Sequence, residues 1–237
     1  MADLPGVTPP LGAAGESMTL VARIARLRNW GMLILLLLLV AGIFVIPTLV
    51  PEGTSWRLFT DLLMTLVLVS GVLAIADHRK LAVALAILAV LVIVARWAEW
   101  FVTAGNLQSF RHVSTLVACV LLAAAVGINV FAPGRSIGDR VFGAIVLYLL
   151  VGLIASFAYA ALYAADSGAF SKLPSASGGE YDWLYFSFVT LTTLGYGDIT
   201  PIARSARALA MLEALVGQLY PAIIIARFVS LPGNTGR

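Results

Sequence analysis

The chain has 237 residues, of which 61% are hydrophobic and only 11% are charged, and its formal net charge is +3. A soluble domain is close to half apolar and a quarter charged, so this composition excludes an ordinary soluble fold and predicts several membrane spans. The small net charge and the scattered basic residues exclude nucleic-acid binding. The single cysteine, Cys119, lies in an apolar run, so we expect a buried thiol and no intrachain disulfide.

Six apolar segments are long enough to cross a lipid bilayer as helices, which takes about 20 residues each. In chain order these segments cover residues 30–50, 58–76, 81–103, 113–131, 141–164 and 206–229. Prolines, glycines or charged residues separate consecutive segments, as expected where the chain leaves the membrane.

The spacing of the six segments predicts an all-α membrane protein with two parts. Residues 30–132 would form a four-helix membrane domain, residues 133–140 a linker and residues 141–231 a second domain; the short ends would be residues 1–29 and 232–237. Basic residues are more numerous near the span ends on the side of the two termini, which predicts a multi-pass cell-membrane protein with cytoplasmic termini. The preference for Arg over Lys is typical of a GC-rich bacterial genome.

A seventh apolar stretch lies between the fifth and sixth spans and is too short to cross, since a helix of about twelve residues covers only about 18 Å. A Gly- and Ser-rich loop precedes it and a Gly-rich turn follows it, which predicts a re-entrant helix. The region therefore divides into an outer loop (165–181), a short helix (182–193), a turn (193–198) and a final helix (206–230). Asp182 is positioned to cap the short helix.

The sequence of the turn, TLTTLGYGD from Thr190 to Asp198, resembles the signature sequence of the potassium channel family. Val is commoner in that family where this chain has Leu194. The resemblance covers about residues 141–231, and it implies a homotetramer in a lipid bilayer that conducts potassium ions passively and is not an enzyme. The implied selectivity filter consists of Thr193, Leu194, Gly195, Tyr196 and Gly197.

The chemistry of ion selection explains these residue types. Backbone carbonyls can replace the water of a dehydrated potassium ion only if successive carbonyls face the same way. Glycines allow such a path because they adopt backbone angles closed to other residues. The resemblance implies carbonyl rings from Thr193 to Tyr196, with the Thr193 hydroxyl forming the innermost ring. It also implies that the supporting residues are Thr192, Asp198, Tyr185 and Trp183, with Asp198 bonding one of the two aromatic residues.

The last span contains three unusual residues. Gly217 lies near the position where related channels bend, and Pro221 removes a helix hydrogen bond one turn later, so we expect these two residues to form a gating hinge. Glu213 is a carboxylate within a span and needs a partner or water. We expect it either behind the filter, bonded to hydroxyls of the short helix, or facing a water-filled cavity, and we favour the first.

The four spans before the pore match voltage-gated channels in topology only. A voltage sensor needs repeated Arg or Lys in the fourth span, and residues 113–131 contain neither. Charged residues within the second and third spans are Asp61, Arg96 and Glu99, which we expect to cluster near the outer side. The cluster is either a structural ion pair or an atypical voltage sensor.

Three other functions fit the sequence less well than a potassium channel does. A non-selective cation channel usually lacks the filter tyrosine, and Tyr196 is present. An intramembrane aspartyl protease carries the motifs found here at Gly195–Asp198 and at Tyr181 and Asp182, but its two aspartates lie on separate spanning helices. A transporter with broken helices usually has a second, corresponding half, which this sequence lacks.

Overall fold

The computed structural model describes residues 31–50, 54–74, 79–98, 100–101, 106–131, 137–171 and 179–230. The expected terminal segments 1–29 and 232–237 lie outside these ranges, as does Glu99 of the expected charge cluster. Within them the chain is mainly helical, which confirms the all-α expectation.

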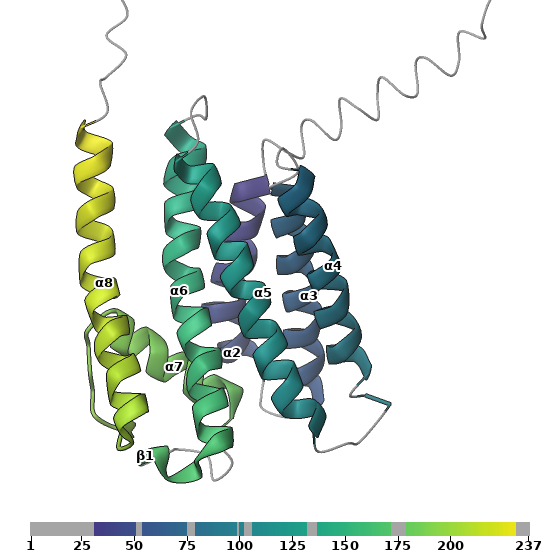
Figure 1. The fold of residues 1–237 in the computed structure, drawn as a ribbon, viewed down its shortest axis with the longest axis vertical. Coiled ribbons are helices and arrows are strands. Elements are labelled where there is room, and N and C mark those ends of the chain that lie inside the picture. Colours follow the sequence, from purple (N-terminus) through teal and green to yellow (C-terminus); the bar gives the residue numbers. More distant parts are fainter. Residues whose placement is uncertain are drawn as a thin grey trace, which may run out of the picture.

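The helices follow the predicted order (Figure 1). The elements are the first helix, Gly31–Leu49, which contains the π-helical turn η1 (Ala41–Val45) and α2 (Ile46–Leu49), then α3 (Thr54–Ala74), α4 (Arg79–Ala98), α5 (Asn106–Phe131), α6 (Ile137–Ala165), the 3₁₀ turn η2 (Ser167–Ala169), β1 (Phe170–Ser171), α7 (Glu180–Leu191), β2 (Thr200–Pro201) and α8 (Arg204–Ser230).

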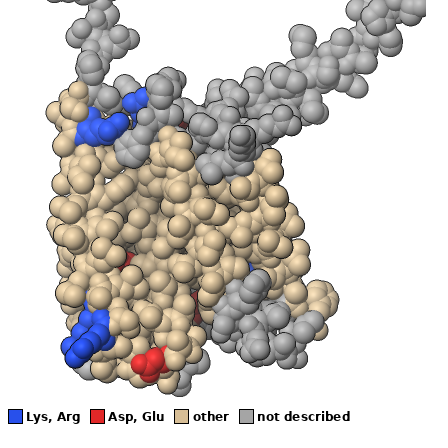
Figure 2. All heavy atoms as spheres, in the orientation of Figure 1, with Lys and Arg blue, Asp and Glu red and all other residues tan. Residues whose placement is uncertain are grey.

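Three helices among the described residues are long and apolar enough to cross a membrane, namely Gly31–Leu49, Gly138–Ala165 and Arg204–Ser230. Two shorter apolar helices, Ala82–Ala98 and His112–Ile128, belong to α4 and α5. Figure 2 shows Lys and Arg at both ends of the molecule, while the face between the ends is almost uncharged. This distribution fits a protein whose middle lies in lipid.

Two predicted boundaries are corrected by the structure. Residues 137–140, assigned to a linker, form the first turn of α6, where Asp139 lies near the positive end of the helix dipole. The short helix α7 occupies residues 180–191 instead of 182–193, so it begins and ends two residues earlier than predicted. Asp182 is therefore its third residue and not its cap; the N-cap residue is Gly179, with no side-chain cap bond.

The first helix and α3 to α5 form a bundle on one side of α6, α8 lies on the other side, and α7 contacts both α6 and α8 (Figure 1). Bundle and α6 share one core of buried apolar side chains, which includes Leu35, Leu39, Leu122, Val126, Leu150 and Leu153. Phe44 of the first helix also contacts Phe188 of α7 edge to face, with 5.9 Å between ring centroids. The bundle therefore packs against both α6 and α7 within the chain.

A short two-stranded sheet joins the segment before α7 to the segment before α8. β1 pairs antiparallel with β2, with Phe170 opposite Pro201 and Ser171 opposite Thr200. The N–H groups of Ile202 and Ala203 both donate to Ala169 O, at 2.8 and 3.1 Å. The sheet thus fastens the segment after the turn to the C-terminal end of α6.

The bundle contains a buried ion pair between α3 and α4. Arg96 donates to Asp61 Oδ1 from Nε at 2.7 Å and approaches it with Nη2 at 2.6 Å, and Trp100 Nε1 donates to Asp61 Oδ2 at 3.0 Å. Asp61 and Arg96 are only 1% and 3% exposed. Both carboxylate oxygens have a donor, which offsets the cost of burying the charges.

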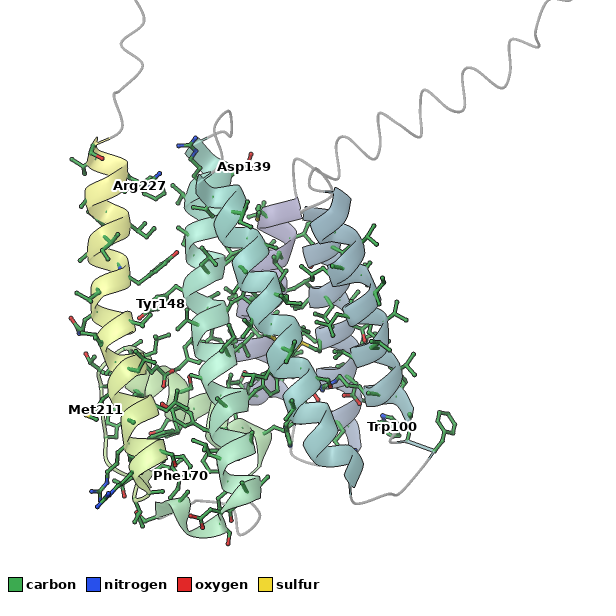
Figure 3. The ribbon with its side chains drawn as sticks, viewed as in Figure 1. Trp100, Asp139, Tyr148, Phe170, Met211 and Arg227 are labelled. Atoms are coloured by element: carbon green, nitrogen blue, oxygen red, sulfur yellow. The ribbon has the colours of Figure 1, made fainter. Side chains whose placement is uncertain are left out.

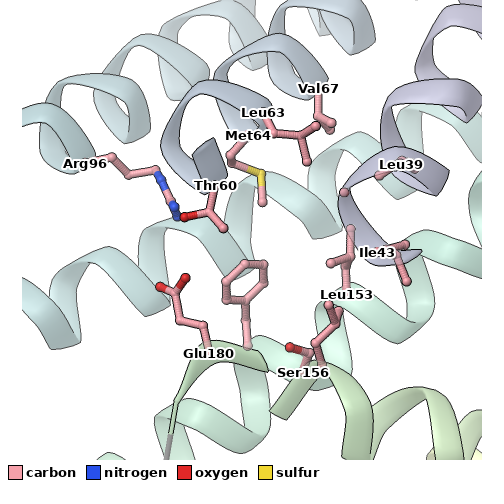
Figure 4. A pocket seen from close by; sticks show the side chains of 13 residues that line it. Leu39, Ile43, Thr60, Leu63, Met64, Val67, Arg96, Leu153, Ser156 and Glu180 are labelled. Carbon is pink, nitrogen blue, oxygen red and sulfur yellow. The ribbon is translucent and has the colours of Figure 1, made fainter. Parts of the chain in front are cut away.

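A cavity of about 70 Å³ lies where the bundle meets α6 and α7 (Figure 4). Its walls are mainly apolar, and Arg96 and Glu180 lie at one side of it. The space exceeds what one water molecule needs, so the joint between bundle and α7 is less tightly filled than an ordinary protein core.

Candidate functional site

The turn after α7 is held by the last carbonyls of that helix. The Thr192 N–H and hydroxyl both donate to Phe188 O, at 3.0 and 2.6 Å. Val189 O accepts from the N–H groups of Leu194 and Gly195, at 2.9 and 3.3 Å. These bonds satisfy carbonyls that a helix end leaves without partners, and they use the N–H groups at the base of the turn.

Residues 193–197 form a ribbon in which every second residue has a positive φ. The values are 59° at Thr193, 56° at Gly195 and 77° at Gly197, and no other described residue has a positive φ. In an extended strand successive carbonyls point to opposite sides. Reversing the sign of φ at every second residue turns alternate peptide planes, so the carbonyls can face one side.

The carbonyls of this ribbon have no donor in the described part of the chain. None of the backbone carbonyl oxygens of Thr193, Leu194, Gly195 and Tyr196 accepts a hydrogen bond there, and all four residues are exposed. A Cβ placed on Gly195 or Gly197 would meet nothing within 4 Å, so the positive φ, and not a lack of space, favours glycine at both positions. An exposed row of carbonyl oxygens without N–H donors is suited to binding cations.

Two large side chains of the ribbon are left uncovered by the rest of the chain. Leu194 is 58% exposed and Tyr196 is 68% exposed. The predicted packing of these side chains behind the ribbon therefore has no partner within one described chain. Covering them requires another surface, either a second copy of the chain or another molecule.

Asp198, directly after the ribbon, is bonded to α7. Of the two aromatic residues considered as its partner, Tyr185 donates from Oη to Asp198 Oδ2 at 2.6 Å. This bond lowers the pKa of the Asp198 carboxyl and raises the pKa of Tyr185 to about 12. Trp183 instead packs against Phe170 and Tyr163, with ring centroids 4.9 and 5.0 Å apart. Trp183 thus belongs to the aromatic core that supports α7.

Glu213 of α8 is buried among three helices and is only 3% exposed. Tyr159 of α6 donates from Oη to Glu213 Oε2 at 2.6 Å, and Ser187 of α7 forms a short hydrogen bond with Glu213 Oε1. Ser187 Oγ also lies 2.7 Å from Gly152 O of α6. Of the two positions expected for Glu213, the carboxylate takes the buried one, bonded to a hydroxyl of α7.

Gly217 lies against the end of α7. A Cβ placed there would lie 1.8 Å from Leu191 O and 2.8 Å from Leu191 C, so only glycine allows this approach of α8. α8 continues as a helix through Gly217 and Pro221. Gly217 therefore has a packing function that the sequence analysis, which assigned it to a hinge, did not identify.

Sequence analysis also missed three polar partners of the site. Tyr159 and Ser187 hold Glu213, and Gln218 Nε2 donates to the Thr193 hydroxyl at 2.9 Å. None of the three has a local motif, because each partner lies 25 or more residues away in the chain. Only the position of Gln218, directly after Gly217, offered a clue that it lies near the turn.

Comparison with known proteins identifies the family. Residues 162–232, which include α7, the ribbon and α8, match the family model described as "Ion channel". Protein LctB of Bacillus caldotenax is 34% identical to the chain over 122 residues, which cover 48% of this chain and 90% of that protein. The chain belongs to the ion channel family.

Two further relatives match shorter parts of this ion channel. Protein LctB of Geobacillus stearothermophilus is 40% identical over 76 residues, covering 30% of this chain and 56% of that protein. Two pore potassium channel c of Oryza sativa subsp. japonica is 38% identical over 88 residues, covering 37% of this chain and 19% of that protein. No solved structure matches the chain. The resemblance to potassium channels is thereby confirmed at the level of the family.

Proposed function

We propose that this ion channel conducts potassium ions passively and that the ribbon Thr193–Gly197 is its selectivity filter. The observation that carries the proposal is the row of exposed carbonyls that accept no hydrogen bond from the described residues, together with positive φ at every second residue. A potassium ion that loses its water needs several oxygens at once, and stacked carbonyl rings supply them. The similarity to two pore potassium channel c of rice supports potassium as the ion.

The ribbon contains the residues that the resemblance to potassium channels links to potassium selectivity. Tyr196 is present, which favours a selective pore over a non-selective one. Leu194 takes the place of the commoner Val, but its side chain is directed to the outside of the ribbon backbone in the proposed arrangement. The additional methylene would then change packing and leave the oxygen ligands in place.

A complete pore requires four chains around an axis, because one ribbon supplies only one side of each oxygen cage. α8 lies along one edge of the molecule, and its Met211 is 68% exposed (Figure 3). The exposed side chains of Leu194 and Tyr196 lie on the same module. Contact among four copies through this edge would cover these side chains and place the four ribbons together, so we propose a homotetramer.

The first helix and α3 to α5 would add four spans to the two of the pore module, giving six spans with α7 as a re-entrant helix. Figure 3 places Asp139 and Arg227 at one end of the molecule and Trp100 and Phe170 towards the other, as the proposed orientation requires. Asp139 and Arg227 would then lie on the cytoplasmic side.

Steep voltage gating has little support in the bundle. α5 carries no basic residue from His112 to its end, and the Asp61–Arg96 pair has donors for both carboxylate oxygens. A charge so well paired is expensive to move, so we assign the pair to structure and not to a sensor.

A gating bend in α8 is a separate proposal. Pro221 removes one helix hydrogen bond and is exposed, so α8 can bend there without disturbing α7. A bend at Gly217 would have to preserve its close approach to Leu191. We therefore place the more mobile point of the hinge at Pro221.

The proposal is tested with purified full-length channel in liposomes that hold a potassium gradient. We expect potassium flux that barium blocks and that sodium does not replace. Gly195→Ala forces a side chain onto a residue with φ of 56° and should abolish the flux. Gly127→Ala is the matched control, because its Cβ would only touch Leu147 at 3.9 Å. Equal sodium and potassium flux, or full flux in Gly195→Ala, would contradict the proposal.

A further inference from the structure

α8, the inner helix of the proposed pore, is bonded to the ribbon through the side chain of Gln218. Its Nε2 donates to the Thr193 hydroxyl at 2.9 Å, across 25 residues of sequence. Gln218 is exposed within one chain and so is not a filler of the core. A polar side chain on an apolar helix that reaches an ion-binding residue needs a reason beyond packing.

The two neighbouring threonines use their hydroxyls differently. Thr192 donates its hydroxyl proton to Phe188 O at 2.6 Å, so this side chain belongs to the end of α7. The Thr193 hydroxyl makes no bond to α7; its described partner is Gln218. The Thr192 hydroxyl is thus anchored to α7, whereas the Thr193 hydroxyl is bonded to α8.

A threonine hydroxyl has two acceptor positions and one proton. When the Gln218 amide occupies one acceptor position, the hydroxyl proton is restricted to the two remaining positions, and whichever of them the proton leaves free can accept a cation. Thr193 also has a φ of 59°, which is unfavourable for a residue with a side chain. The amide thus restrains a residue whose backbone alone would not keep its orientation.

Gly217 explains how Gln218 reaches the ribbon. The absent side chain at Gly217 lets the α8 backbone approach Leu191 at the end of α7, two residues before Thr193. The next residue of α8 is then close enough for a side-chain amide to reach the hydroxyl. Gly217 and Gln218 thus act as one docking segment of α8.

Resting on the proposed function, we propose that Gln218 is a positioning residue for the innermost ion site, where it orients the Thr193 hydroxyl for potassium. It acts through Thr193 and does not itself bind the ion. Because α8 carries this contact, any movement of α8 near residue 218 changes the innermost site. The filter and the inner helix are therefore coupled by one hydrogen bond in each chain.

The test measures potassium binding through the thermal unfolding of the purified full-length channel at increasing potassium concentration, with sodium as the reference ion. An ion that binds only the folded state stabilises it by RT ln(1 + [ion]/Kd), so the rise of the unfolding temperature with ion concentration reports the apparent Kd. We expect Gln218→Leu, which keeps the volume and removes the amide, to weaken apparent potassium affinity roughly two- to tenfold, the range of one neutral hydrogen bond. Ser205→Ala, on an exposed residue at the start of α8, is the control and should leave the affinity unchanged.

A double-mutant comparison separates positioning from general packing. Gln218→Leu should lower the affinity in Thr193→Ser, which keeps the hydroxyl, and should have no further effect in Thr193→Val, which lacks it. An equal loss in both backgrounds would overturn the proposal. So would an unchanged affinity in Gln218→Leu alone, a result that needs no Thr193 variant to fold. If potassium does not stabilise the unaltered channel more than sodium does, the proposed function itself fails.

Discussion

Replacing Gly217 with alanine tests whether the contact between α8 and the end of α7 is required. The new Cβ would lie 1.8 Å from Leu191 O and 2.8 Å from Leu191 C, and both atoms belong to backbone. An ordinary contact of about 3.5 Å would require the two helices to separate by more than about 1 Å. Overpacking of this kind costs about 1–3 kcal/mol.

The gain in helix propensity partly opposes this cost. Alanine is better than glycine inside a helix by about 1 kcal/mol, so the net loss of stability should be about 0–2 kcal/mol. The same separation would carry Gln218 away from Thr193, and the apparent potassium affinity should fall together with the stability. Gly127→Ala has the same gain in propensity and only an ordinary contact with Leu147 at 3.9 Å, so it should be neutral or stabilising.

The assay combines thermal unfolding of the purified full-length channel with potassium flux in liposomes. The comparison of Gly217→Ala with Gly127→Ala removes the contribution of propensity. If both variants unfold at the same temperature and conduct potassium equally, the close approach at Gly217 has no energetic importance. If Gly217→Ala unfolds at the same temperature as Gly127→Ala but changes the potassium flux, the hinge interpretation is favoured over the docking interpretation.

Three further predictions concern buried or bonded charges. Glu213→Ala should destabilise the channel by about 1–3 kcal/mol, since the hydroxyls that bond the carboxylate lose their acceptor. Glu213→Gln should lose less stability, and thermal unfolding measures both variants. The lowered pKa of Asp198 means that its bond from Tyr185 is complete above the usual value of 3.8 and is lost as the pH falls through the lower folded value. Potassium flux should therefore not change between external pH 7 and 5, and a decrease that Asp198→Asn removes would contradict this. Asp61→Asn should lower the free energy of unfolding by about 3–5 kcal/mol, because it leaves the Arg96 charge buried without its partner. The double variant Asp61→Leu with Arg96→Met should lose less stability, since it removes both charges. A double variant that unfolds at a lower temperature than Asp61→Asn would refute this reasoning.

Long apolar runs and the short motif of the turn were readable from the sequence, because each is a local property. A helix of about 20 apolar residues needs no knowledge of its neighbours, and the order of the helices followed the predicted spans. The glycines at 195 and 197 were predicted to allow unusual backbone angles, and both have positive φ. Thr193 also has positive φ, which its residue type did not predict, since threonine rarely adopts it.

Partners across the fold could not be read from the sequence. The need of Glu213 for a hydrogen-bond partner followed from its burial in an apolar segment, but Tyr159 as a donor depends on how α6 and α8 pack. Gly217 was interpreted as a hinge because glycine loosens a helix. The structure shows that the absent side chain also makes room for the Leu191 carbonyl, and these two uses of glycine have the same sequence signature.

The contact of Phe44 with Phe188 has a consequence for assemblies of unlike chains. Because the outer helices of each chain touch the α7 of that same chain, an alteration in one bundle acts first on its own quarter of the proposed pore. Channels assembled from altered and unaltered chains should then respond in steps that follow the number of altered copies. A design in which neighbours exchanged their bundles would spread each alteration over two quarters.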